Sequence, residues 1–79
     1  GDALSFRLAA LEYLDRSKAT ALLSEYRVYL LKLIGELVAQ KAAIKDPNSL
    51  TAWIFERNIM KAEADLNWVD LYSQHKNSV

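Results

Sequence analysis

The acidic side chains of the C-terminal half are the first candidates for chemistry in this sequence. Glu56, Glu63, Asp65 and Asp70 lie close together along the chain, and His75 is the only histidine. Helical di-metal sites combine carboxylates with Glu-x-x-His pairs on facing helices. The sequence contains no such pair and no cysteine. We therefore expect no metal, no cofactor and no disulfide.

Four cations form a second group, Arg27, Lys32, Lys41 and Arg57. Cations placed around the two carboxylates of a substrate, together with a hydrogen-bond donor at its ether oxygen, can stabilise the charge that develops when the substrate rearranges. Residues 14–41 resemble superficially the first helix of all-helical chorismate mutases, which are intertwined dimers with this chemistry. The cation spacing matches that family poorly, and only Gln74 could be the late donor. We predict that the chain is not an enzyme and keep this activity as an alternative.

The composition limits the remaining classes. The chain has 79 residues, of which 52% are apolar, and its ten basic and ten acidic side chains give zero net charge. Without a basic stripe, we do not expect this segment itself to bind DNA. No apolar run is long enough for a membrane span, and the absence of cysteine fits a cytoplasmic protein. A core this small usually needs a partner chain.

Hydrophobic spacing predicts an all-α fold with helices at about 3–14, 18–44 and 50–74. In the second helix, a coiled-coil-like seam repeats at intervals of four and three, with Leu23, Leu31, Ile34 and Val38 beside it. Asp15 or Ser17 is expected to cap this helix, and the segment 45–49, with Pro47, ends it. The seam residues are Tyr26, Leu30, Leu33, Leu37, Gln40 and Ile44.

The third helix has two apolar faces, and Asp46 or Ser49 is expected to cap it. Residues 75–79 are predicted to be a fraying polar tail. One face consists of Ala52, Phe55, Ile59, Ala62, Leu66 and Val69. The other consists of Trp53, Met60, Ala64, Trp68, Leu71 and Tyr72.

The short loop makes the two long helices an antiparallel hairpin, which covers only one face of each. We therefore predict that the hairpin, preceded by the short helix, pairs with a second copy into an intertwined bundle or antiparallel coiled-coil-like homodimer. Aromatic anchors should dominate such an interface. The expected interface residues are Leu30, Ile34, Leu37, Trp53, Ile59, Met60, Trp68 and Leu71.

Two further features concern how the helices meet. Counting back from the loop places Arg27 beside about Asn67, so Arg27 should pair with Glu63 or Asp70 and fix the register of the hairpin. Gly35 lies inside the second helix, where glycine destabilises. It marks either a close helix crossing or a tolerated glycine.

Residues 50–72 resemble the last helix of PadR-like transcriptional regulators of the virulence-activator-alpha (AphA-like) type. Glu63, Trp68, Val69 and Asp70 resemble a motif of that helix, in which a glutamate is followed after two or three residues by a tryptophan, an apolar and an acidic residue. Here four residues separate Glu63 from Trp68. Residues 6–37 are similar to the earlier helices of the same domain, with Phe6, Leu22, Leu23 and Arg27 at positions where the family has like residues.

The resemblance implies that residues 1–79 form the C-terminal dimerisation domain of a bacterial regulator. DNA would then be bound only by an N-terminal winged-helix domain that this chain does not contain, and some relatives bind apolar or aromatic effectors near the dimer interface. The first residue, Gly1, likewise favours a fragment of a longer protein. A hetero-association module, pairing with a different helical protein, and a free-standing helical protein of unrelated function remain further alternatives.

Overall fold

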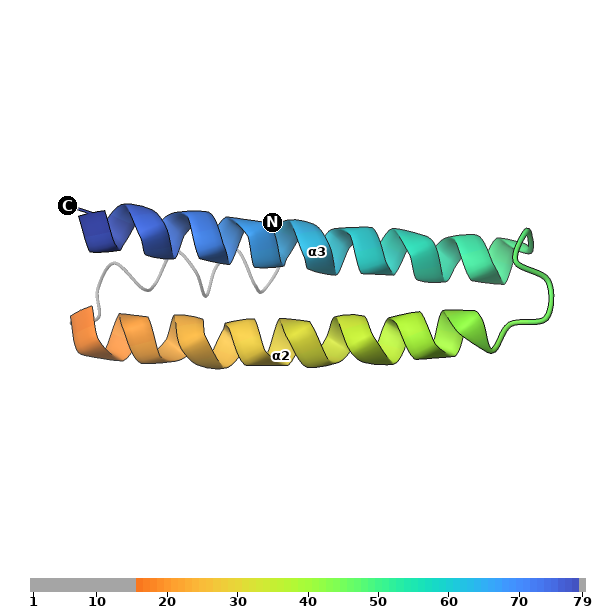
Figure 1. Cartoon of the computed structure of the whole chain (residues 1–79), viewed down its shortest axis with the longest axis horizontal. Helices are drawn as coiled ribbons and strands as arrows, with labels where there is room; N and C mark the ends of the chain where they lie inside the picture. Colours follow the sequence, from red (N-terminus) through yellow and green to blue (C-terminus); the bar gives the residue numbers. More distant parts are fainter. Residues whose placement is uncertain (1–15, 79) are drawn as a thin grey trace.

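The computed structural model describes residues 16–78 as two helices that run side by side in opposite directions (Figure 1). Helix α2 spans Arg16–Ala42 and helix α3 spans Leu50–Ser78, and the loop 43–49 joins them. The described residues contain no strand. The all-α hairpin predicted from the sequence is therefore confirmed, whereas the predicted helix at 3–14 and Asp15 lie outside the described residues.

Two predicted helix ends and one predicted cap are wrong. Ser17 lies within α2, which spans Arg16–Ala42, and so does not cap it from outside, while the other predicted cap, Asp15, lies outside the described residues. Helix α2 ends at Ala42 rather than Ile44, because the amides of Ala43 and Ile44 bond to carbonyls only three residues back, which tightens the last turn. The tail predicted to fray after Gln74 instead continues α3 to Ser78.

The last turns of α3 make contacts at the open end of the hairpin. Lys76 lies with its Nζ atom 5.7 Å from the centre of the Tyr72 ring. The Lys76 carbonyl accepts a hydrogen bond from the Arg16 guanidinium at 3.4 Å, which joins the two helices where they are farthest from the loop. A cation in the last turn also interacts favourably with the helix dipole.

The loop turns the chain and starts α3 with hydrogen bonds of its own. The Ser49 amide donates to the Asp46 carbonyl at 3.1 Å, which closes a turn with Pro47 at its second position. The Asp46 carboxylate accepts from the Asn48 amide at 2.9 Å, so Asp46 stabilises the turn. Ser49 caps α3, because its Oγ accepts from the Ala52 amide at 3.1 Å.

We expect Ser49→Ala to lower the free energy of unfolding by about 1 kcal/mol, because the Ala52 amide loses its acceptor at the start of α3. Urea denaturation followed by helix circular dichroism measures the change. Ser49→Asp keeps an acceptor at the cap and is the matched control. An alanine variant as stable as the wild type would show that this hydrogen bond contributes nothing.

The core lies along the line where the helices face each other. Leu23 and Leu30 of α2 pack with Ala62 and Val69 of α3. The first predicted face of α3 is confirmed as the core face, since four of its six members are buried and Phe55 and Leu66 are half-buried. The buried side chains among the described residues are Leu23, Leu30, Ala52, Ile59, Ala62 and Val69.

Candidate interaction surface

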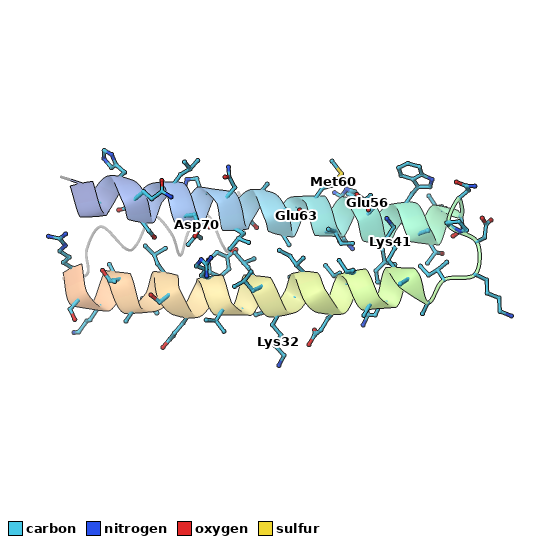
Figure 2. The ribbon with its side chains drawn as sticks, viewed as in Figure 1. Lys32, Lys41, Glu56, Met60, Glu63 and Asp70 are labelled. Carbon is cyan, nitrogen blue, oxygen red and sulfur yellow. The ribbon has the colours of Figure 1, made fainter. Side chains whose placement is uncertain are left out.

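Five of the six residues of the second predicted face of α3 lie away from α2, and we call these five the α3 row: Trp53, Met60, Ala64, Trp68 and Leu71. The prediction is wrong for the sixth, Tyr72, which is half-buried and packs against the core because it lies closer to the core side of the helix. Trp53 and Met60 are each 61% exposed, Leu71 is 57% exposed and Trp68 is 42% exposed. Figure 2 shows the Met60 side chain pointing away from α2. Because a helix turns 100° per residue, the row falls opposite the buried residues of the same helix. This helix therefore presents large apolar side chains on two sides.

The other predicted interface residues lie inside the hairpin. Leu30 is 2% exposed and Ile59 is 6% exposed, and each is covered within its own chain. Ile34 packs beside the same core, and Leu37 is half-buried. The remaining four predicted interface residues, Trp53, Met60, Trp68 and Leu71, are exposed on α3.

The two tryptophans differ in how their own chain supports them. The Trp68 ring stacks on Tyr72, with ring centres 5.3 Å apart and planes 9° from parallel. An offset stack of this kind contributes about 0.5–1.5 kcal/mol beyond the area that it buries. Trp53 is more exposed and lies in the first turn of α3. Trp68 is therefore partly a structural residue, whereas the hairpin depends less on Trp53.

Polar side chains join the two helices at several levels. Arg27 Nε donates to Asp70 Oδ1 at 2.8 Å, so the guanidinium lies one turn beyond the predicted level of Asn67 and pairs with Asp70 rather than Glu63. The Tyr26 hydroxyl donates to Asp65 at 3.4 Å. These groups are partly exposed, so each pair contributes at most about 1 kcal/mol. Their main consequence is a fixed register.

One inter-helix ion pair was not predicted. Lys41 Nζ donates to Glu56 Oε2 at 2.5 Å, near the loop. Figure 2 shows Lys41 reaching from α2 toward Glu56 on α3. Glu56, Glu63 and Asp70 recur every seven residues, so they lie along one edge of α3. That spacing was visible in the sequence, but the partners of the carboxylates depend on the register of the hairpin.

The cations of the enzyme alternative point in different directions. Arg27 and Lys41 pair with carboxylates of the same chain at two separate levels. Figure 2 shows Lys32 pointing away from α3. The fourth cation, Arg57, is exposed on α3. A substrate carboxylate bound by Arg27, Lys32 or Lys41 would lie away from the other two of these three side chains. Within residues 16–78, no cluster of histidine and carboxylate side chains has a geometry that could hold a metal ion.

Neither described helix is long and apolar enough to span a membrane. Comparison of the whole chain with protein-family models, with curated proteins and with solved structures gives no match. The resemblance to PadR-like regulators therefore remains a prediction from the sequence motifs.

Proposed function

We propose that this chain is a homodimerisation domain, and that it dimerises a PadR-like transcriptional regulator. The observation that carries the proposal is the α3 row, where Trp53, Met60, Trp68 and Leu71 stay exposed on the side of α3 away from α2. Contiguous exposed apolar residues mark interaction sites on small proteins. Tryptophan is the side chain most enriched among residues that dominate binding energy.

A second copy is the partner favoured by the charge of the chain. Ten basic and ten acidic side chains leave no net charge, so two copies can approach without overall repulsion, and neither nucleic acid nor an acidic surface is attracted. The hairpin also buries few large side chains for its length. Covering the α3 row would add to the apolar area removed from water, at about 25 cal/mol per Å².

Dimerisation gives the regulator its function through geometry. Two DNA-binding domains attached to a symmetric dimer are held at a fixed separation, which lets them contact paired half-sites on one face of the duplex. This part of the proposal rests on the resemblance of residues 50–72 to the last helix of PadR-like regulators. In this proposal the present chain supplies the association, and separate DNA-binding domains contact the bases.

Sedimentation velocity over a range of micromolar concentrations tests the association. We expect a species of at least two chains that dissociates on dilution. A monomer at every concentration would contradict the proposal, and a complex that forms only with a different protein from the native cell would favour hetero-association.

A reporter assay tests the regulatory role. Fused to a DNA-binding domain that needs dimerisation to occupy its operator, the chain should restore operator binding. The same fusion carrying Trp53→Ala should not. Restoration by both fusions would show that the α3 row is dispensable for dimerisation.

A further inference from the structure

Two contacts between the helices mark the two sides of the hairpin. Counted around α2 from the buried Leu30 at 100° per residue, Tyr26 lies about 40° to one side and Arg27 about 60° to the other. Their partners on α3, Asp65 and Asp70, fall on opposite sides of the core face in the same way. The Tyr26 hydrogen bond and the Arg27 ion pair therefore lie on opposite sides of the line along which the helices meet.

The side marked by Tyr26 carries aromatic and apolar side chains from both helices near the open end. Leu22, Tyr29 and Trp68 are exposed, whereas Tyr26 and Tyr72 are half-buried and pack against the core. The rings lie in pairs, since Tyr26 stacks on Tyr29 with ring centres 6.2 Å apart and Trp68 stacks on Tyr72. We call this surface the aromatic side, and it consists of Leu22, Tyr26, Tyr29, Trp68 and Tyr72.

The side marked by Arg27 is polar over the same length of the hairpin. Thr20 and Ser24 precede Arg27 on this side of α2, and Asp70 and Ser73 lie on this side of α3. Arg27 and Asp70 already pair with each other. An apolar helix at the open end would therefore meet aromatic rings on one side of the hairpin, and hydroxyl groups and an ion pair on the other.

The aromatic side covers only the half of the hairpin near its open end. Leu22 and Tyr29 lie about 9 and 20 Å along the axis from Arg16. Farther toward the loop, the exposed side chains Gln40 and Lys61 follow on the same side, with Ile54 as an apolar exception. The occupant that fits this surface is therefore a short helix near the open end, rather than a helix as long as α2 or α3.

We infer that residues 3–14 of the same chain pack over the aromatic side as a third helix, antiparallel to α2. These residues lie outside the described part of the chain, which begins at Arg16, so they are joined directly to the open end. Folded back from Arg16, a helix of this length is about 18 Å long and ends level with about residue 28 of α2. Its stripe of Leu4, Leu8 and Leu11, at intervals of four and three, would contact the rings.

The connection at Arg16 favours this occupant over a straight continuation of α2. The Arg16 guanidinium bonds to the Lys76 carbonyl and α3 ends at Ser78, so a straight helix would carry the leucine stripe past the end of the hairpin. Asp15, a predicted cap of α2, fits a turn at this point. A segment tethered beside its binding surface also has an effective concentration of roughly millimolar, so it binds there before a second copy at micromolar concentration.

The third helix contacts only its own chain, so its packing does not depend on homodimerisation. Trp53 and Met60 of the α3 row stay open to a second copy, because they lie toward the loop, beyond the end of a helix of this length. Trp68 lies where the aromatic side and the α3 row adjoin.

An engineered disulfide tests the side and the direction, because the chain has no cysteine of its own. Folding back places Arg7 level with about residue 23 of α2, so Arg7→Cys and Leu22→Cys in one chain should bring two thiols within bonding reach. Ser24 lies at the same level on the polar side, which makes Arg7→Cys with Ser24→Cys the matched control. In dilute protein under mild oxidation, the first pair should link within one chain roughly ten times faster than the control, because a disulfide requires Cβ atoms about 4 Å apart.

Three results of this experiment would overturn the packing. Equal linking of both pairs would show that residues 3–14 have no fixed side, and no linking of either pair would show that they do not fold back. Tagged Arg7→Cys chains that link to untagged Leu22→Cys chains, without a link inside the double variant, would place the segment on another copy. Linking of the first pair alone within one chain supports the packing.

A charge in the leucine stripe gives an independent test. Leu8→Asp places a carboxylate against the rings, whereas Ala9→Asp places the same group about 100° around the predicted helix. At a concentration where the protein is monomeric, the urea midpoint should fall by about 1 M for Leu8→Asp and change little for Ala9→Asp. Equal shifts would overturn the packing.

Both tests use monomeric protein, so their results separate from those of the proposed function. A wild-type chain that is monomeric at every concentration contradicts homodimerisation but leaves the third helix intact. A dimer without the intramolecular disulfide overturns the third helix and leaves homodimerisation intact.

Discussion

Replacing Leu30 by alanine is expected to lower the free energy of unfolding by about 2–5 kcal/mol, because the truncation leaves a cavity at the centre of the hairpin. Leu30 is 2% exposed and packs with Leu23, Ala62 and Val69. A core of this size supplies only about 3–5 kcal/mol in total. The variant should therefore be largely unfolded when dilute, with most of its helix circular dichroism lost.

Leu50→Ala is the matched control for this change. Leu50 is 77% exposed, so the same truncation should alter stability by no more than about 0.5 kcal/mol. Leu30→Met, which nearly conserves volume, should cost less than about 1.5 kcal/mol and keeps the measurement informative if Leu30→Ala does not fold. Equal losses for Leu30→Ala and Leu50→Ala in urea denaturation would show that Leu30 is not a core residue.

The division of α3 into a core face and an exposed face could be predicted because its apolar residues form two separate stripes. Ile59 and Val69 fall on one stripe and Trp53 and Met60 on the other. The antiparallel direction of the two helices could also be predicted, because the connection between them is short. Periodicity alone then decides which residues of α3 can face α2 together.

The same reasoning is confirmed for most of the predicted seam of α2, where Leu30 is buried and Tyr26 and Leu33 pack against the core. It does not place the other apolar residues of α2, which lie on several sides of the helix. Leu22, Val28, Tyr29, Leu31 and Val38 all remain exposed, although each resembles a core residue in type. Which side faces α3 depends on rotation and register. In the structure these follow from contacts between the helices, such as Arg27 with Asp70 and Lys41 with Glu56, and neither carboxylate is marked as the partner by its local sequence.

The end of α3 shows a related limit. Residues 75–78 are polar and have no apolar face, so the sequence predicts fraying there. The helix nevertheless continues to Ser78, and there the Lys76 carbonyl accepts a hydrogen bond from Arg16, a residue sixty positions earlier in the chain. Contacts over such a separation leave no local pattern in the sequence.

Replacing Trp53 by alanine is expected to dissociate the dimer while leaving the hairpin folded. A tryptophan that dominates an interface typically contributes about 2 kcal/mol or more. A two-fold symmetric interface that contains this residue contains it twice. The Kd of the dimer should therefore rise by roughly a thousandfold, since about 1.4 kcal/mol corresponds to a factor of ten.

Trp68→Ala is the informative comparison, because its ring also stacks on Tyr72 of the same helix. This variant should lose both dimer affinity and hairpin stability, whereas Trp53→Ala should lose affinity alone. Sedimentation equilibrium gives the first quantity, and urea denaturation at a concentration where both proteins are monomeric gives the second. A Trp53→Ala chain with wild-type dimer affinity would place this residue outside the interface. If both variants lose the same hairpin stability, the different exposed fractions of Trp53 and Trp68 do not predict which of them stabilises the hairpin.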